Sequence, residues 1–191
     1  MRIGKIKRET KETKVEVQVN LDGSGKANVD TSVRFLDHLL SSFAKHGCID
    51  LKVRARGDFR HHVAEDVMIA IGAAIDRALG GKIGIRRMGD AIVPMDDALA
   101  LVAIDLGGRA YPRIDLKFKG RKLADLNLDL IEHLLQTLAT NGKFNLHVKL
   151  LRGRNDHHKV EAVFKALGVA LGDAVSRRPR AKGVSSTKGV I

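Results

Sequence analysis

The chain has 191 residues, 44% of them hydrophobic and 29% charged, a balance that indicates a globular protein with a buried core and excludes a disordered or fibrous chain. No apolar run approaches the roughly 20 residues that cross a bilayer, and the charged N-terminus lacks the apolar stretch of a secretory signal. Cys48 is the only cysteine, which excludes an intrachain disulfide and favours a reducing, cytoplasmic compartment.

The formal net charge of +12 is compatible with three kinds of partner: nucleic acid, an acidic membrane or a phosphorylated substrate. Aromatic residues make up 4% of the chain, with one tyrosine and no tryptophan, so a base-stacking surface has few side chains to use. Lysine and arginine that merely solvate the surface would give the same composition.

In the first half of the chain, strand and helix patterns alternate. Valine at every second position of 15–19 predicts a strand that enters a glycine-containing turn. Apolar residues at helical spacing over 36–43 predict a helix that ends at Gly47. Alternation over 49–54 predicts a half-buried strand, and an amphipathic helix is expected from about 64 to 79.

The second half repeats the first. Residues 35–40 (FLDHLL) recur 95 positions later as residues 130–135 (LIEHLL). After one inserted residue, residues 61–65 (HHVAE) recur as residues 157–161 (HHKVE). A match of this length with one gap indicates an internal duplication.

Two further strands are predicted in the second half, at 98–106 and 111–118, on either side of a Gly-Gly break. The fold class is therefore α+β: an internally duplicated α/β sandwich in which each half is a small mixed sheet carrying two helices on one face. We expect residues 1–84 to form the first half, 85–176 the second half, and 177–191 a basic, mobile, substrate-binding tail on one compact domain.

Six of the eight histidines lie in the duplicated motifs, so each half contributes three histidines and one glutamate. The eight residues are His38, His61, His62, Glu65, His133, His157, His158 and Glu161. The first histidine of each pair and the glutamate are four positions apart and share one face at the start of a helix. Adjacent histidines point in different directions, so we expect the halves to exchange ligands and form two sites of three histidines and one glutamate.

This ligand set suits a divalent transition metal. Imidazole favours Zn, Fe, Ni or Cu, and the carboxylate keeps Mn possible. Four protein ligands on a six-coordinate ion leave two positions for substrate, as a catalytic metal requires. Histidines that cap helices or fill the core are the alternative, which the repetition in register disfavours. Asp37 and Glu132 are expected either to fix a histidine tautomer or to offset a helix dipole.

Basic residues gather in loops that also contain glycine or hydroxyl groups. They are Arg86-Arg87, Arg109 after Gly107-Gly108, and the tail segment Ser185–Gly189. Hydroxyls, backbone N–H groups and lysine in such loops bind phosphate, and arginine adds bidentate contacts. Beside a metal site these loops favour a small anionic substrate over nucleic acid.

From about Arg8 to its C-terminus the chain resembles the imidazoleglycerol-phosphate dehydratase family, lyases of histidine biosynthesis. The motifs that carry the resemblance are TKET at 10–13, FLDH at 35–38, HHxxED at 61–66, PMDDAL at 94–99, DLGGR at 105–109, GRNDHHKVEAxFKA at 153–166 and STKGV at 186–190.

The resemblance implies dehydration of imidazole glycerol phosphate to imidazole acetol phosphate, with two Mn²⁺ ions per active site bound by the eight histidines and glutamates. It implies sites between subunits of a homo-oligomer of twenty-four chains, and no nucleic-acid or membrane partner. The residues that it assigns are Arg87, Arg109, Ser186 and Lys188 for the phosphate, Lys165 for a further substrate contact, and Glu65, Glu161 or Glu12 for proton transfer.

The chain departs from the family pattern in two places. The segment from Gly57 to His61 is three residues shorter than the family's usual loop and lacks the acids that usually precede the histidine pair. Ser42 stands where a glutamine that touches substrate is usual. These differences concern the surroundings of His61 and His62 and remove no ligand.

Two other functions remain open from the residues alone. A basic RNA-binding module with the ribosomal protein S5 domain 2-like fold would explain the charge, although it does not need the histidine register. A metal-dependent hydrolase of a phosphorylated small molecule would use the same ligands to activate water.

Overall fold

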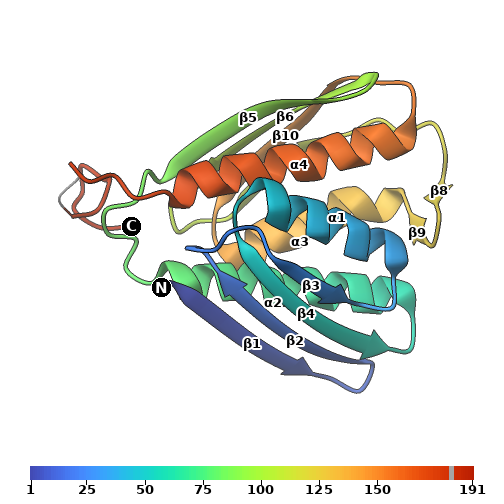
Figure 1. The fold of residues 1–191 in the computed structure, drawn as a ribbon, viewed down its shortest axis with the longest axis horizontal. Coiled ribbons are helices and arrows are strands. Elements are labelled where there is room, and N and C mark those ends of the chain that lie inside the picture. Colours follow the sequence, from blue (N-terminus) through green and yellow to red (C-terminus); the bar gives the residue numbers. More distant parts are fainter. Residues whose placement is uncertain (181–182) are drawn as a thin grey trace.

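The computed structural model describes residues 1–180 and 183–191. Two four-stranded sheets form its outer layers, and four helices pack between them, as Figure 1 shows. Each sheet therefore buries one face against helices, and this arrangement confirms the predicted duplicated sandwich. Over the described residues, no helix has the length and apolar character needed to cross a membrane.

The first half contains a mixed sheet of strand order β1-β2-β4-β3, in which only β3 and β4 are parallel. Its elements are β1 (Ile3–Glu9), β2 (Thr13–Asn20), β3 (Ala27–Asp30), α1 (Arg34–His46), β4 (Asp50–Gly57) and α2 (Arg60–Leu79). The valines of β2 are buried as their alternation predicts. Helix α2 begins four residues earlier than expected, which places His61 and His62 in its first turn.

The second half has the same topology, with strand order β5-β6-β10-β7. Its elements are β5 (Met88–Met95), β6 (Ala98–Asp105), β7 (Tyr111–Asp115), the hairpin β8 (Lys122–Leu123) and β9 (Leu126–Asn127), α3 (Asp129–Gly142), β10 (Asn145–Arg152) and α4 (Asp156–Val175). Strand β7 ends at Asp115, earlier than predicted. The backbone N–H groups of Lys119 and Gly120 donate instead to the Asp156 carboxylate.

The helices of one half pack against those of the other, α2 on α3 and α1 on α4. Glycine makes these approaches possible. A Cβ atom on Gly72 would lie 2.6 Å from the carbonyl oxygen of Leu138, and one on Gly168 would lie 2.4 Å from that of Phe43. The two repeats are therefore interlocked, and residues from one half face residues from the other.

All four helices begin at the same end of the molecule, close to β8 and β9 in Figure 1. The duplicated histidines lie at or near these helix starts. The opposite end carries the loops that follow α2 and α3, together with the C-terminal tail. The fold therefore separates the predicted metal ligands from the predicted phosphate contacts.

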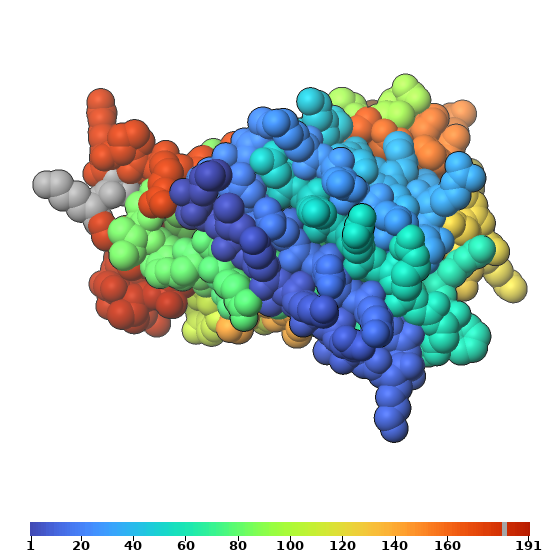
Figure 2. Space-filling view, turned by 60° about the horizontal axis from the view of Figure 1, so that its bottom comes forward, coloured from blue at the N-terminus to red at the C-terminus, as the bar shows by residue number. Residues whose placement is uncertain are grey.

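The basic tail, predicted to be mobile, packs along the segment that follows α2. Arg178 donates its backbone N–H to the carbonyl of Gly84, and Gly84 donates in turn to Gly183. Figure 2 shows the red tail against the green residues that follow α2. Backbone pairing of this kind requires no hydrophobic periodicity, which is why the sequence pattern does not predict it.

Candidate active site

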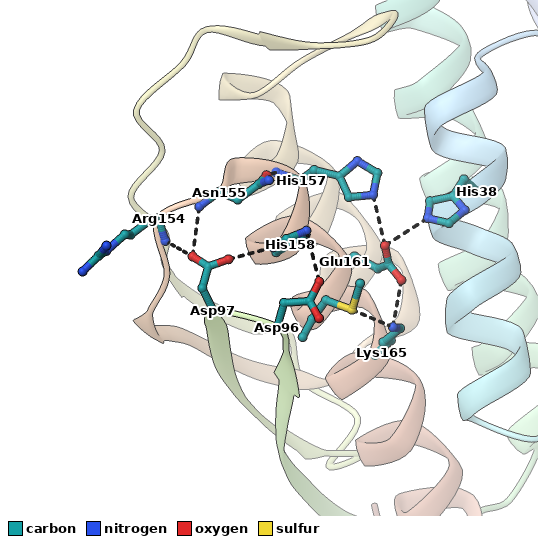
Figure 3. A network of polar contacts seen from close by, with 10 residues as sticks. His38, Asp96, Asp97, Arg154, Asn155, His157, His158, Glu161 and Lys165 are labelled. Atoms are coloured by element: carbon teal, nitrogen blue, oxygen red, sulfur yellow. Dashed lines mark hydrogen bonds and ion pairs between the residues drawn. The ribbon is translucent and has the colours of Figure 1, made fainter.

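Two histidines and a glutamate from different repeats meet between α1 and α4. Nε2 of His38 lies 3.3 Å from Oε2 of Glu161, and Nε2 of His157 lies 3.1 Å from the same oxygen. The three ligand atoms lie within 4.8 Å of one another, close enough to hold one metal ion. Figure 3 shows the two rings converging on the carboxylate. We call this group the His38 cluster.

The Glu161 carboxylate is buried but held in its ionised form. Nζ of Lys165, one turn further along α4, lies 2.8 Å from Oε1 of Glu161. Burial alone would raise the pKa of Glu161, yet hydrogen bonds from Lys165 and His38 outweigh it and lower the pKa to about 2. A carboxylate that is negative at neutral pH is the form that binds a cation.

The pseudo-equivalent group in the other half is only partly assembled. Nε2 of His133 on α3 lies 3.2 Å from Oε1 of Glu65 on α2, matching the contact between His38 and Glu161. His61, the counterpart of His157, does not join them among the described residues. Its exposed ring instead stacks on Phe59, with ring centroids 5.6 Å apart.

The second histidine of each pair is held through Nδ1 by a carboxylate. Nδ1 of His158 lies 2.7 Å from Oδ1 of Asp97, and Nδ1 of His62 lies 2.9 Å from Oδ1 of Asp58. Glu12 lies further from the same atom of His62, at 3.7 Å. Hydrogen bonds from these histidines lower the pKa of both aspartates. A carboxylate on Nδ1 fixes the tautomer and leaves Nε2 of His62 available as a metal ligand. Nε2 of His158 also lies 3.3 Å from Oδ2 of Asp96, as Figure 3 shows.

Of the two roles expected for Asp37 and Glu132, the structure favours the offset of a helix dipole, because both lie in the first turn of their helices, α1 and α3, and contact other groups than the histidines. Asp37 accepts hydrogen bonds from the backbone N–H and the hydroxyl of Thr31, and Glu132 accepts from Gln136. Sequence reasoning placed the acids next to the histidines of α1 and α3. In the structure, the acids that contact the paired histidines at Nδ1 are Asp58 and Asp97.

Both of these aspartates had a signal in the sequence. Asp58 stands four positions before His62, a spacing that brings side chains together at a helix start. It supplies a carboxylate even though the loop before the pair is short. Asp97 lies in the motif at 94–99, whose strand turn returns to the start of α4.

A basic pocket of about 590 Å³ lies at the opposite end of the molecule. Its lining residues are Asp76, Gly80, Lys82, Arg87, Gly107, Gly108, Arg109, Lys143, Ser186, Thr187, Lys188, Val190 and Ile191. Four of the five predicted substrate contacts line it, whereas Lys165 lies beside Glu161. The pocket has the side chains and the glycine turn that phosphate binding needs.

The guanidinium of Arg87 is already engaged within the chain. It contacts Asp105 through Nε at 2.6 Å and Nη2 at 3.0 Å, and its Nη1 donates to the carbonyl of Ser185 at 2.7 Å. In the described part of the chain, Arg109 and Lys188 lack acidic side-chain partners. Arg87 therefore mainly joins β6 to the tail, and the other two cations are free to face an anion.

The fold and these groups define a class: a duplicated α/β sandwich enzyme with candidate histidine–carboxylate metal-binding clusters. The family model for imidazoleglycerol-phosphate dehydratase matches residues 31–171. The chain is 51% identical over its full length to imidazoleglycerol-phosphate dehydratase from Dehalococcoides mccartyi, covering 97% of that protein. It is 52% identical to the enzyme of that name from Chloroflexus aggregans, over 97% of this chain and 93% of the relative.

Two solved structures have the same fold. The dehydratase from Staphylococcus aureus superposes with a TM-score of 0.85 at 32% identity, covering 92% of this chain and 99% of that one. The Pyrococcus furiosus enzyme, in complex with (S)-C348, superposes with a TM-score of 0.85 at 38% identity, covering 97% of this chain and 100% of that one. The chain belongs to the imidazoleglycerol-phosphate dehydratase family, and is thus a hydro-lyase of histidine biosynthesis.

Proposed function

We propose that the chain converts imidazole glycerol phosphate to imidazole acetol phosphate at a site that holds two Mn²⁺ ions. The observation that carries the proposal is the exchange of ligands between repeats. His38 of the first half meets Glu161 of the second, and His133 of the second half meets Glu65 of the first. An exchange that occurs twice, in register, gives one cluster for each ion.

The donor chemistry of the clusters fits a divalent transition metal. Each combines imidazole nitrogen with carboxylate oxygen, a mixture that accepts Mn²⁺. Because its Nδ1 atom is bound to a carboxylate, His62 offers Nε2, and His158 would offer Nε2 once the metal replaces its 3.3 Å contact with Asp96. When bound, the metal would act as a Lewis acid and stabilise negative charge on the substrate imidazole. We therefore propose all eight duplicated histidines and glutamates as ligands.

The reaction removes the hydroxyl group from the carbon next to the imidazole and a proton from the neighbouring carbon, and the enol that results becomes the ketone of the product. Glu12 is the best placed of the three candidate acids to carry this proton. It lies beside His62 but outside both cross-repeat pairs, and its side chain is 58% exposed. Glu161 is bound to Lys165 and two histidines, so it serves better as a ligand than as a base.

The separation of the two functional ends supports an active site between subunits. Helix α2 has 20 residues and, at about 1.5 Å per residue, spans roughly 30 Å. His62 lies in its first turn, whereas Lys82 of the basic pocket follows its end. A ring joined to a phosphate by three carbons cannot bridge that distance. We propose that a metal cluster of one subunit faces the basic pocket of another in a large homo-oligomer, in agreement with the twenty-four chains that the resemblance implies.

Neither a membrane nor a nucleic acid is needed by this chemistry, and the lone Cys48 is consistent with the cytoplasm. The test is product analysis of Mn²⁺-loaded protein with imidazole glycerol phosphate. We expect a product lighter than the substrate by one water that retains its phosphate. Release of inorganic phosphate would identify a hydrolase instead, and no turnover by a metal-loaded, fully assembled protein would reject the proposal.

A further inference from the structure

Lys82 is a nearly buried cation in the short loop between α2 and β5. The residue is only 6% exposed, and it is one of the residues that line the basic pocket. The backbone of Lys82 has a φ angle of 54°, in the left-handed region that residues other than glycine seldom occupy. Such backbone strain persists where the surrounding structure enforces it, often at a ligand site.

No acidic side chain among the described residues forms an ion pair with Lys82. The two carboxylates that attract the Lys82 ammonium most strongly already form ion pairs with other residues. Asp76 pairs with Lys143 at 2.8 Å, and Asp105 pairs with Arg87 at 2.6 Å. Residues 181 and 182 are alanine and lysine, so neither can supply a carboxylate side chain. Burying a cation without a partner is unfavourable, and an anion in the pocket would compensate for it.

The ammonium group of Lys82 points toward the glycine turn of the pocket. A Cβ atom on Gly108 would lie 3.4 Å from the backbone carbonyl carbon of Ile191 and 3.6 Å from Nζ of Lys82, and Gly108 has a φ angle of +79°. Without a side chain at Gly108, the ammonium, the turn and Ile191 come together here, and an anion in the pocket would bind the ammonium beside Ile191. Burial also lowers the pKa of Lys82, as expected for a cation with no counter-ion in place.

We propose that Lys82 binds the substrate phosphate, sharing it with Arg109 and Lys188, while Arg87 holds the tail. The proposal rests on the proposed function, because it takes the phosphorylated substrate as the occupant of the pocket. It reassigns the main contacts: the cation that is buried and unpaired binds the anion, and the arginine that is paired with Asp105 positions Ser185.

The test compares Lys82→Met with Lys82→Arg in the assembled, Mn²⁺-loaded enzyme, with Lys149→Met as the matched control. Lys149 is exposed on β10, outside the basic pocket, so its variant loses the same charge elsewhere. For each protein, the KM, the kcat and the competitive inhibition constant of inorganic phosphate are measured. The melting temperature is recorded with and without phosphate.

We expect Lys82→Met to raise both the KM and the phosphate inhibition constant by at least about tenfold, as loss of a charge-assisted contact does. The kcat should change by less than about threefold, Lys82→Arg should recover part of the affinity, and the control should match the wild type. Unchanged KM and phosphate inhibition in Lys82→Met would overturn the proposal, even if its melting temperature fell, since that result assigns Lys82 a structural role. A weaker phosphate inhibition with an unchanged KM would also overturn it, because the phosphate would then be free anion rather than substrate.

The phosphate measurements separate this inference from the proposed function. If the wild type fails to dehydrate the substrate, the proposed function fails, yet the melting temperature still reports phosphate binding. In that case, if phosphate raises the melting temperature of the wild type and the control but not that of Lys82→Met, Lys82 is still an anion ligand. Only the identity of the substrate is then rejected. If the wild type is active and Lys82→Met retains the full phosphate stabilisation, the Lys82 inference alone is rejected.

Discussion

His158 and Asp97 form a hydrogen bond of 2.7 Å between Nδ1 and Oδ1, and this contact ties the β5–β6 turn to the start of α4. The second oxygen of Asp97 accepts from the backbone N–H groups of Arg154 and Asn155. One carboxylate thus fixes both the ring of His158 and the loop that carries it. The contact between His62 and Asp58 does the same for α2 with fewer partners.

Replacing Asp97 with asparagine is expected to weaken metal binding without removing a ligand. The amide loses the charge that orients His158, and such substitutions lower metal affinity by roughly 10- to 100-fold. Metal content after dialysis against graded chelator measures the effect. Glu132→Gln is the control, because Glu132 contacts Gln136 rather than a histidine. Equal metal retention by both variants would exclude this role for Asp97.

Removal of the metal should abolish dehydration. The chain's own residues supply no other Lewis acid at the His38 cluster, and losing several kcal/mol of charge stabilisation slows turnover by about 100-fold or more. Chelator-treated protein is assayed before and after Mn²⁺ is restored, and circular dichroism checks that the fold persists. Full activity in a preparation that metal analysis finds empty would contradict the mechanism.

Arg109 and Lys188 should affect substrate binding more than turnover. Their alanine variants are expected to raise the KM by about tenfold each with little change in kcat, since phosphate contacts are the same in ground state and transition state. Arg87→Ala should differ by also lowering the melting temperature, because it breaks the contacts to Asp105 and Ser185. If all three variants keep the wild-type KM, the basic pocket does not bind substrate.

Gly168 should not tolerate a methyl group. Its Cβ would lie 2.4 Å from the carbonyl oxygen of Phe43, so Gly168→Ala must push α1 away from α4. We expect a loss of about 1–3 kcal/mol in the free energy of unfolding, as for other overpacked cores. Urea denaturation measures it. Gly81→Ala is the control, since its nearest neighbour would be 3.7 Å away, and an equal loss in both would point to glycine flexibility rather than to packing.

Asp50 should contribute stability that acid removes. The backbone N–H groups of Ser24 and Lys26 donate to its carboxylate at 2.8 and 3.0 Å and lower its pKa. A pKa that is lower in the folded state gives stability that is fully present above the unfolded value of about 3.9 and is lost as the pH falls through the folded value. Asp50→Asn should therefore be less stable than the wild type at pH 7, with a smaller difference at pH 3. Urea denaturation at both values tests this, and a difference independent of pH would refute it.

The duplication and the eight candidate ligands could be predicted because they depend on local spacing and on repetition along the chain. The groups that orient the ligands could be predicted only where the spacing is local, as it is for Asp58 and His62. Asp97 reaches His158 through the return of a strand turn, and the pairing of Arg87 with Asp105 depends on how β5 and β6 lie side by side. Lys82 belongs to no motif that the sequence analysis identified. Its role is inferred from its burial and from the fact that Asp76 and Asp105 already pair with other cations.

The exchange of ligands between repeats also limits how such a protein could have arisen. A half-length chain carrying one copy of the motifs would place its histidine pair and its glutamate on one helix, while the histidine that completes the group would belong to another copy. The contact between His38 and Glu161 would then have joined two identical molecules. An ancestor of half the length could have bound metal in this way only as a homodimer, and gene fusion would have made that partnership permanent while allowing the two copies to diverge.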